Sequence, residues 1–227
     1  MSRQQTARLA GALYLAMGLL AAFTLMYLES VFHVPGDATA TANRIAASLA
    51  LYRFGVFADL MAGVFTVWLV MVLYDLFKDV DRRQARLMVG FAFAMVAIGL
   101  VNTVLTAGPL VLASGASYLS AFDKHQLDAL TLGFLGLQGQ GTRAATMYWG
   151  LWLLPLGILV YRSGFLPRLL GVLVFVAGCS YVINCLTYFF FPDYARIGAL
   201  VSIVPQAFGE FGFILWTLIK GAREDAA

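Results

Sequence analysis

Six long runs of apolar residues alternate with short polar segments along this chain. We place them at about residues 7–32, 52–77, 85–110, 143–161, 166–190 and 195–219. A helix needs roughly 20 mostly apolar residues to cross the hydrocarbon core of a bilayer, and each run is about that long or longer. The pattern therefore predicts an all-α, polytopic membrane bundle of six transmembrane helices.

Two longer connections, residues 33–51 and 114–141, carry helix signals of their own. In the first, Asp37 is suited to cap the start of an alanine-rich helix. In the second, apolar residues recur at helical spacing opposite a charged side, which predicts an amphipathic helix lying on the outer membrane interface. We expect this second outer-side helix either to cap the bundle or to form a lid over an outward-opening pocket.

Composition supports a membrane location. The chain has 227 residues, of which 61% are hydrophobic and 12% are charged, whereas soluble domains have about 25% charged residues. The six spans and their connections use nearly the whole length, so we expect a single integral membrane domain over residues 1–227. The net charge of +3 does not indicate a nucleic-acid partner, and membrane lipids are the expected partners. The sequence does not define an oligomeric state.

The distribution of basic residues predicts the topology. If the N-terminus is inside, ten of the fifteen Lys and Arg residues fall on the inner side and five on the outer side or at outer span ends. Cytoplasmic segments of membrane proteins carry an excess of Lys and Arg. We therefore predict a multi-pass protein of the bacterial cytoplasmic (inner) membrane with both termini in the cytoplasm.

Polar residues interrupt the apolar runs, mostly in their outward-facing halves. An ionisable side chain inside a membrane usually faces the bundle interior and often marks a functional site. Eight such side chains, drawn from all six spans, are expected to converge on one ligand-binding cavity; they are Glu29, Arg53, Asp59, Asn102, Arg143, Asn184, Gln206 and Glu210.

The charges of this set do not balance. Three acids oppose two arginines, which leaves one negative charge in excess, and a buried uncompensated charge is costly. Either one acid is neutral or a cation binds. We expect Arg53 and Arg143 to hold an anionic group, while Asp59 and Glu210 bind a cation or carry a proton.

Motifs for redox, metal or nucleophilic chemistry are missing from the sequence. It contains no CxxC, HExxH or Cys/His cluster, so we assign no catalytic residue, metal ligand or cofactor. We favour a non-enzymatic role: binding or moving a small molecule, ion or lipid headgroup through the polar cavity. One alternative is an intramembrane enzyme acting on a lipid, with Asp59 or Glu210 as the acid–base group. Another is a structural or regulatory subunit whose polar residues only hold helices together.

Five segments carry a resemblance to a known family. They are ARLAGALYL (7–15), VPGDATATANRI (34–45), YRFGVFADL (52–60), YRSGFLPRLLGVL (161–173) and FGEFGFILWTLIKG (208–221). In these segments the chain resembles the bacterial multi-pass membrane family labelled domain of unknown function 4386. The resemblance covers nearly the whole length and implies a six-helix integral membrane protein of prokaryotic type. It implies no activity.

Overall fold

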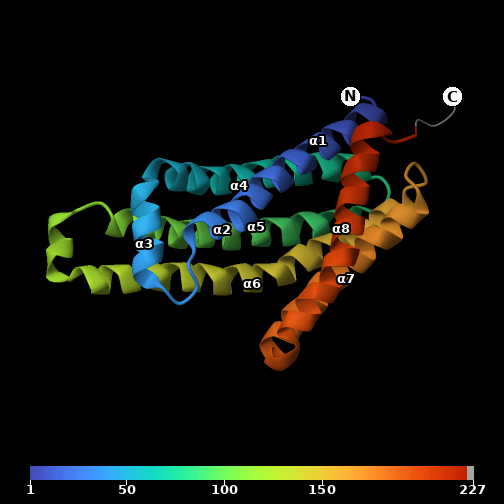
Figure 1. Cartoon of the computed structure of the whole chain (residues 1–227). Coiled ribbons are helices and arrows are strands. Elements are labelled where there is room, and N and C mark those ends of the chain that lie inside the picture. The colour runs from blue at the N-terminus through green and yellow to red at the C-terminus, as the bar shows by residue number, and fades with distance from the viewer. Residues whose placement is uncertain (224–227) are drawn as a thin grey trace. The chain divides into compact units, whose positions relative to one another are not determined.

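The computed structural model describes residues 1–223, and this part of the chain is almost entirely helical (Figure 1). Its elements in order are α1 (Arg3–Ala22), η1 (Phe23–Leu28), α2 (Glu29–Phe32), α3 (Ala38–Ala47), α4 (Leu49–Phe77), α5 (Arg82–Leu112), η2 (Ser117–Ala121), α6 (Lys124–Arg162), α7 (Arg168–Phe190), η3 (Pro192–Tyr194) and α8 (Ala195–Ile219). The predicted all-α fold is confirmed.

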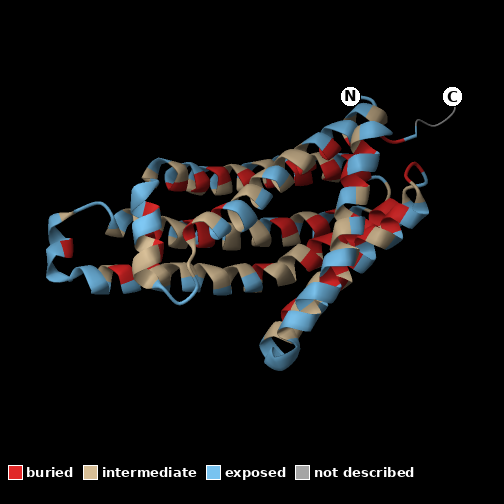
Figure 2. Cartoon of the chain, in the orientation of Figure 1, coloured by how far each residue is buried: buried red, intermediate tan, exposed pale blue. Residues whose placement is uncertain are grey.

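In the described part of the chain, six helical segments are long and apolar enough to cross a membrane. They are Arg3–Phe32, Leu49–Phe77, Arg82–Leu112, Lys124–Arg162, Arg168–Phe190 and Pro192–Ile219. Large apolar side chains lie on the outer surfaces of these helices, for example Val104, Val201 and Phe208, each at least 65% exposed (Figure 2). Such surfaces suit lipid, where no polar group is needed to cover them. The protein is a multi-pass membrane protein, as the sequence predicts.

The first predicted outer-side helix is present as α3. Gly36 has a φ of +78°, a backbone conformation that favours glycine. The chain then reaches Asp37, whose side-chain oxygen accepts a hydrogen bond from the Ala40 amide at 2.8 Å. The predicted N-cap is therefore confirmed.

The second predicted outer-side helix is not separate from the fourth span. Residues 124–162 form one continuous helix of 39 residues, α6, which is about 58 Å long at 1.5 Å per residue. Four glycines lie in residues 133–141, and none of them has a positive φ. Glycine weakens a helix without ending it, and the predicted break near residue 142 does not occur.

Two compact units make up the described chain. The first unit comprises residues 1–16, 65–97 and the chain from Arg143 onward. The second unit comprises residues 17–64 and 98–142. The boundaries fall inside α1, α4, α5 and α6, so these helices contribute to both units. A single domain over residues 1–227 stays a prediction.

Each unit has its own buried apolar side chains. Those of the first unit with less than 2% exposure include Tyr14, Phe77, Met88, Leu153, Leu156 and Phe213. The second unit is centred on Leu28, Phe32, Ile45 and Tyr52. In this second cluster the rings of Phe32 and Tyr52 pack edge to face, with centroids 5.2 Å apart. The Tyr52 hydroxyl donates to the Thr106 carbonyl oxygen at 2.8 Å and so ties α4 to α5.

Candidate functional site

The carboxyl group of Glu210, on α8 in the first unit, connects three helices. Its Oε2 accepts a hydrogen bond from the Tyr14 hydroxyl of α1 at 2.6 Å. Its Oε1 accepts one from the Tyr181 hydroxyl of α7, also at 2.6 Å. Hydrogen bonds to an ionised carboxylate are short and about twice as strong as neutral ones. Both oxygens of this intramembrane acid therefore have a phenol partner from another helix.

Aromatic rings surround the two phenols. The Tyr14 ring is 1% exposed and lies 5.6 Å from the Trp152 ring and 6.1 Å from the Phe213 ring, centroid to centroid. The Tyr181 ring meets the Trp149 ring edge to face at 5.9 Å. These contacts fix the hydroxyls on the carboxyl group.

Gln206 lies one helical turn before Glu210. Residues four apart share a helix face, so the amide and the carboxyl group lie on the same side of α8. Among the described residues, the buried Nε2 of Gln206 has no hydrogen-bond partner. A buried donor without an acceptor costs about 1–3 kcal/mol. A water or a ligand oxygen at this position would satisfy it.

The other two predicted residues of the first unit have different surroundings. Arg143 is exposed, and its guanidinium carbon lies 4.3 Å from the centre of the Tyr188 ring on α7. The Arg143 backbone carbonyl accepts a hydrogen bond from the Cys185 thiol at 3.6 Å. Asn184 is half-buried on α7. Arg143 thus contacts α7 through a cation–π interaction.

A second acid lies in the second unit. Asp59 on α4 accepts a short hydrogen bond from the Thr103 hydroxyl on α5. Asn102, the residue directly before Thr103, is 8% exposed, and its Nδ2 lies 3.5 Å from the Thr142 hydroxyl of α6. The Gln138 amide donates to the same hydroxyl at 3.1 Å. This polar cluster joins α4 to α5 and α5 to α6.

The remaining two predicted site residues are exposed. The Glu29 side chain is 68% exposed, and its Oε1 lies 4.0 Å from Nδ1 of His33, one turn away. Arg53 is exposed on α4. The eight predicted residues therefore divide into four in each unit. Their convergence on one cavity stays a prediction.

The partners of the two interior acids are hydroxyl groups. Sequence reasoning considered arginines as partners and did not include Tyr14, Tyr181 or Thr103 in the site. A usable signal existed, because a hydroxyl inside an apolar span needs a hydrogen-bond partner. Which acid it would meet depends on how each helix is rotated about its axis.

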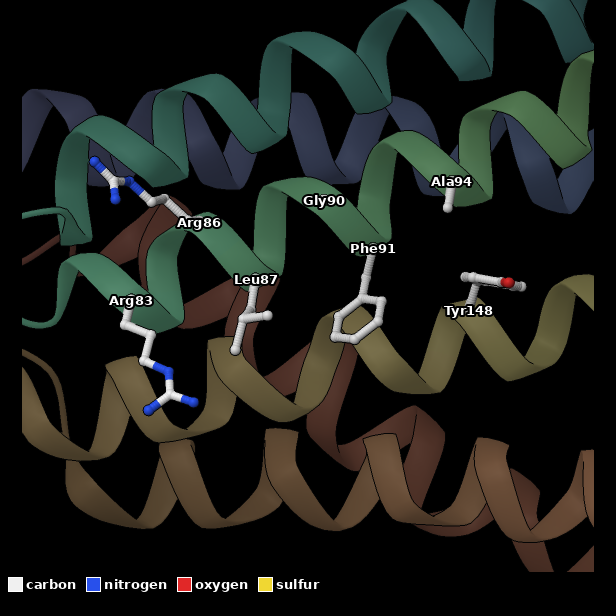
Figure 3. A pocket seen from close by; sticks show the side chains of 7 residues that line it. All are labelled: Arg83, Arg86, Leu87, Gly90, Phe91, Ala94 and Tyr148. Carbon is white, nitrogen blue, oxygen red and sulfur yellow. The ribbon is translucent and has the colours of Figure 1, made fainter.

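The described residues contain no group of three or more His, Cys, Asp or Glu side chains that could hold a metal ion. A hollow of about 530 Å³ lies elsewhere in the first unit, between α5 and α6 (Figure 3). Its lining residues are Arg83, Arg86, Leu87, Gly90, Phe91, Ala94 and Tyr148.

The helices and the interior polar groups define an α-helical, multi-pass membrane protein. The chain belongs to the family described as Domain of unknown function (DUF4386), whose model matches residues 9–221. The resemblance seen in the sequence is thereby confirmed. The chain is also 40% identical over 78 residues to an uncharacterized protein of the archaeon Archaeoglobus fulgidus. This match covers 34% of the chain and 44% of the relative. No solved structure matches.

Proposed function

We propose that the protein binds a small cation, a proton in the simplest case, at Glu210 inside the membrane. The observation that carries this proposal is the pair of 2.6 Å hydrogen bonds from Tyr14 and Tyr181 to the two carboxyl oxygens. The helices present this acid away from aqueous solvent, where a charge is costly unless it is compensated. A bound cation removes the net charge.

The phenol pair suits both charge states of the carboxyl group. When Glu210 is ionised, each tyrosine hydroxyl donates to one oxygen. When Glu210 is protonated, its own O–H donates to one phenol oxygen, because a tyrosine hydroxyl both donates and accepts. The heavy atoms need not move between the two states. A proton can therefore be bound and released without repacking α1, α7 and α8.

Gln206 extends this site along α8. Its buried amide without a partner supports a ligand or water next to Glu210. We further propose that the cation is moved across the membrane or coupled to movement of a second solute. Arg143 and Asn184 of the first unit then belong to the same pathway, with Arg143 holding an anionic group.

A structural role for Glu210 is the second candidate. It is favoured by the fact that both carboxyl oxygens are already hydrogen-bonded, which fits an acid that only fastens three helices together. In that case the carboxyl group keeps one protonation state while the protein is folded. The two candidates therefore differ in whether Glu210 titrates in the folded protein.

Infrared difference spectroscopy tests this directly. The protein is reconstituted in liposomes and its spectra are recorded over a range of pH in which circular dichroism shows an unchanged fold. We expect a carboxyl C=O band that titrates, disappears in Glu210→Gln and shifts in frequency in Tyr14→Phe. Glu29→Gln is the matched control, because Glu29 is exposed and its removal should leave that band in place. Identical spectra for the wild type and Glu210→Gln would contradict the proposal.

Movement of protons across the membrane requires a separate measurement. In liposomes holding a pH-sensitive dye, an imposed potassium gradient with valinomycin drives protons inward through a proton-conducting protein. We expect faster acidification with the wild type than with Glu210→Gln. Equal rates, together with a titrating infrared band, would restrict Glu210 to binding.

For location we propose the bacterial cytoplasmic membrane with both termini inside. The excess of basic residues at the N-terminus, after α4 and after α6 supports this orientation. Fusions of alkaline phosphatase or green fluorescent protein to the C-terminus check it. Fluorescence without phosphatase activity is expected, and the opposite result would place the C-terminus outside.

A further inference from the structure

The hollow between α5 and α6 is a groove with one basic end and apolar walls (Figure 3). Leu87 and Phe91 point from α5 toward α6, and Tyr148 points from α6 toward α5. Arg83 and Arg86 lie at the end of the groove near the start of α5. All of these residues belong to the first unit. The groove thus combines a positive end with an apolar channel.

Two of the three nearby acids, Asp75, Asp79 and Asp81, have a basic partner outside the groove. Asp81 forms an ion pair with Arg162 at 2.7 Å. Asp75 binds Lys78 at 2.7 Å, and this hydrogen bond and the negative charge of Asp75 raise the pKa of Lys78. The positive charges of the groove therefore lie beside two acids that already have other partners and beside the exposed Asp79.

The length of the groove matches one leaflet of a bilayer. From Arg83 to Ala94 the helix rises about 16 Å at 1.5 Å per residue. This is about half of the roughly 30 Å hydrocarbon core. Since Arg83 lies in the first turn of a membrane-spanning helix, the basic end is at the headgroup level and the apolar part extends toward the middle of the membrane.

We propose that this groove is a binding site for an anionic phospholipid. The phosphate contacts the guanidinium group of Arg83, which points from α5 toward α6 and suits phosphate oxygens because of its planar, multiple donors. The Arg86 side chain points away from α6 and adds positive charge at the same end of the groove. One acyl chain lies along Leu87, Gly90, Phe91 and the Tyr148 ring. The absence of a side chain at Gly90 opens the floor of the groove, since a Cβ added there would meet open space.

Native mass spectrometry tests the headgroup contact. The purified full-length chain in detergent is titrated with dioleoyl phosphatidylglycerol or dioleoyl phosphatidylcholine. We expect tighter binding of phosphatidylglycerol, weakened at least about tenfold in R83Q/R86Q, because the charge-assisted hydrogen bonds to the phosphate are lost. R83K/R86K should keep most of the preference. Arg82→Gln, which removes a neighbouring exposed charge outside the groove, should retain nearly all of it.

Gly90→Leu tests the acyl-chain contact. A Cβ at position 90 meets open space, so the added side chain can occupy the groove without a backbone clash, and we expect the fold to be kept while retention of phosphatidylglycerol falls. Gly99→Leu, which also projects into open space on α5, is the matched control and should bind like the wild type. Inorganic phosphate at millimolar concentration should not displace the lipid. Equal binding of the two lipids, full binding by folded R83Q/R86Q or Gly90→Leu, or displacement by phosphate would overturn the proposal.

Discussion

Gly150 on α6 and Gly178 on α7 face each other, and a Cβ at Gly150 would lie 2.6 Å from the Gly178 carbonyl oxygen. Gly157 and Gly171 form a second such pair, in which a Cβ at Gly171 would lie 2.8 Å from the Gly157 carbonyl oxygen. Both pairs are symmetric in sequence about Gly164, which lies in the turn between the helices and has a φ of +72°. Small residues at equal spacing on both arms let the two backbones approach closely.

Replacing Gly150 by alanine should therefore push α6 and α7 apart. Overpacking costs about 1–3 kcal/mol, which corresponds to a loss of about 2–12 °C in melting temperature for a chain of this size. Thermal unfolding in detergent, followed by circular dichroism, measures it. Gly136→Ala is the matched control on the same helix, because a Cβ there meets open space. Alanine is the better helix former, so the control should melt at the same or a higher temperature.

Removing the Tyr14 hydroxyl should destabilise the first unit. In Tyr14→Phe the Oε2 atom of Glu210 loses its donor, and hydrogen bonds to charged groups contribute about 1.5–3 kcal/mol. The loss should be much smaller when Glu210 is already glutamine, because the two residues interact directly. A double-mutant cycle by chemical unfolding measures this coupling. Tyr194→Phe, at a tyrosine that is 62% exposed, should have little effect. Additive effects of Tyr14→Phe and Glu210→Gln would show that the hydrogen bond contributes nothing.

The Asp59–Thr103 contact leads to a parallel prediction for the stability of the second unit. Thr103→Val keeps the shape but removes the donor to Asp59, and an interior acceptor left without its partner costs about 1–3 kcal/mol. Thr103→Ser should restore most of the stability. Thr106→Val is the control, because the Thr106 hydroxyl donates at 2.9 Å to the Asn102 carbonyl of its own helix. If both valine variants lose equal stability, the contact with Asp59 is not what stabilises α4 against α5.

Most of the fold could be predicted from the length and hydropathy of the apolar runs. Six apolar runs predict six membrane helices because the thickness of the bilayer sets the length of each span. The error near residue 142 has the same origin. Glycines and polar residues between 133 and 142 indicate the end of an apolar run, whereas a helix ends only where its backbone conformation changes. α6 therefore continues past the point where its hydropathy changes.

The site could be predicted in part. Glu210 and Asp59 stand out because each is an acid inside an apolar run, and the structure gives both of them hydrogen-bond partners on other helices. Their partners could not be assigned from sequence. A tyrosine such as Tyr181 reaches an acid only if two helices have the right rotation, and that rotation is set by packing at small residues. For α8 against α7, such a place is Gly209, where an added Cβ would lie 2.6 Å from the Ala177 Cβ.

Asp81 has two roles at the start of α5 that mutations can separate. Its Oδ1 accepts hydrogen bonds from the Arg83 and Gln84 amides at 3.1 Å, which is N-capping. Its Oδ2 forms the ion pair with Arg162, whose side chain is 58% exposed. Asp81→Ala removes both roles and should cost about 1–2 kcal/mol, mostly from the cap. Asp81→Asn keeps an acceptor oxygen and should cost less than about 1 kcal/mol, since exposed ion pairs contribute little.

Ionic strength distinguishes the two contributions. The Debye length falls to about 3 Å in 1 M salt, so charges near the surface are strongly screened. The difference in unfolding free energy between the wild type and Asp81→Asn should therefore shrink as salt is added. The difference between Asp81→Asn and Asp81→Ala should persist, because capping uses a local hydrogen bond. Arg162→Gln should behave like Asp81→Asn and is the matched partner. Unfolding curves of all four proteins at low and high salt measure this. If salt leaves the Asp81→Asn difference unchanged while Arg162→Gln is silent, Asp81 acts through the cap alone.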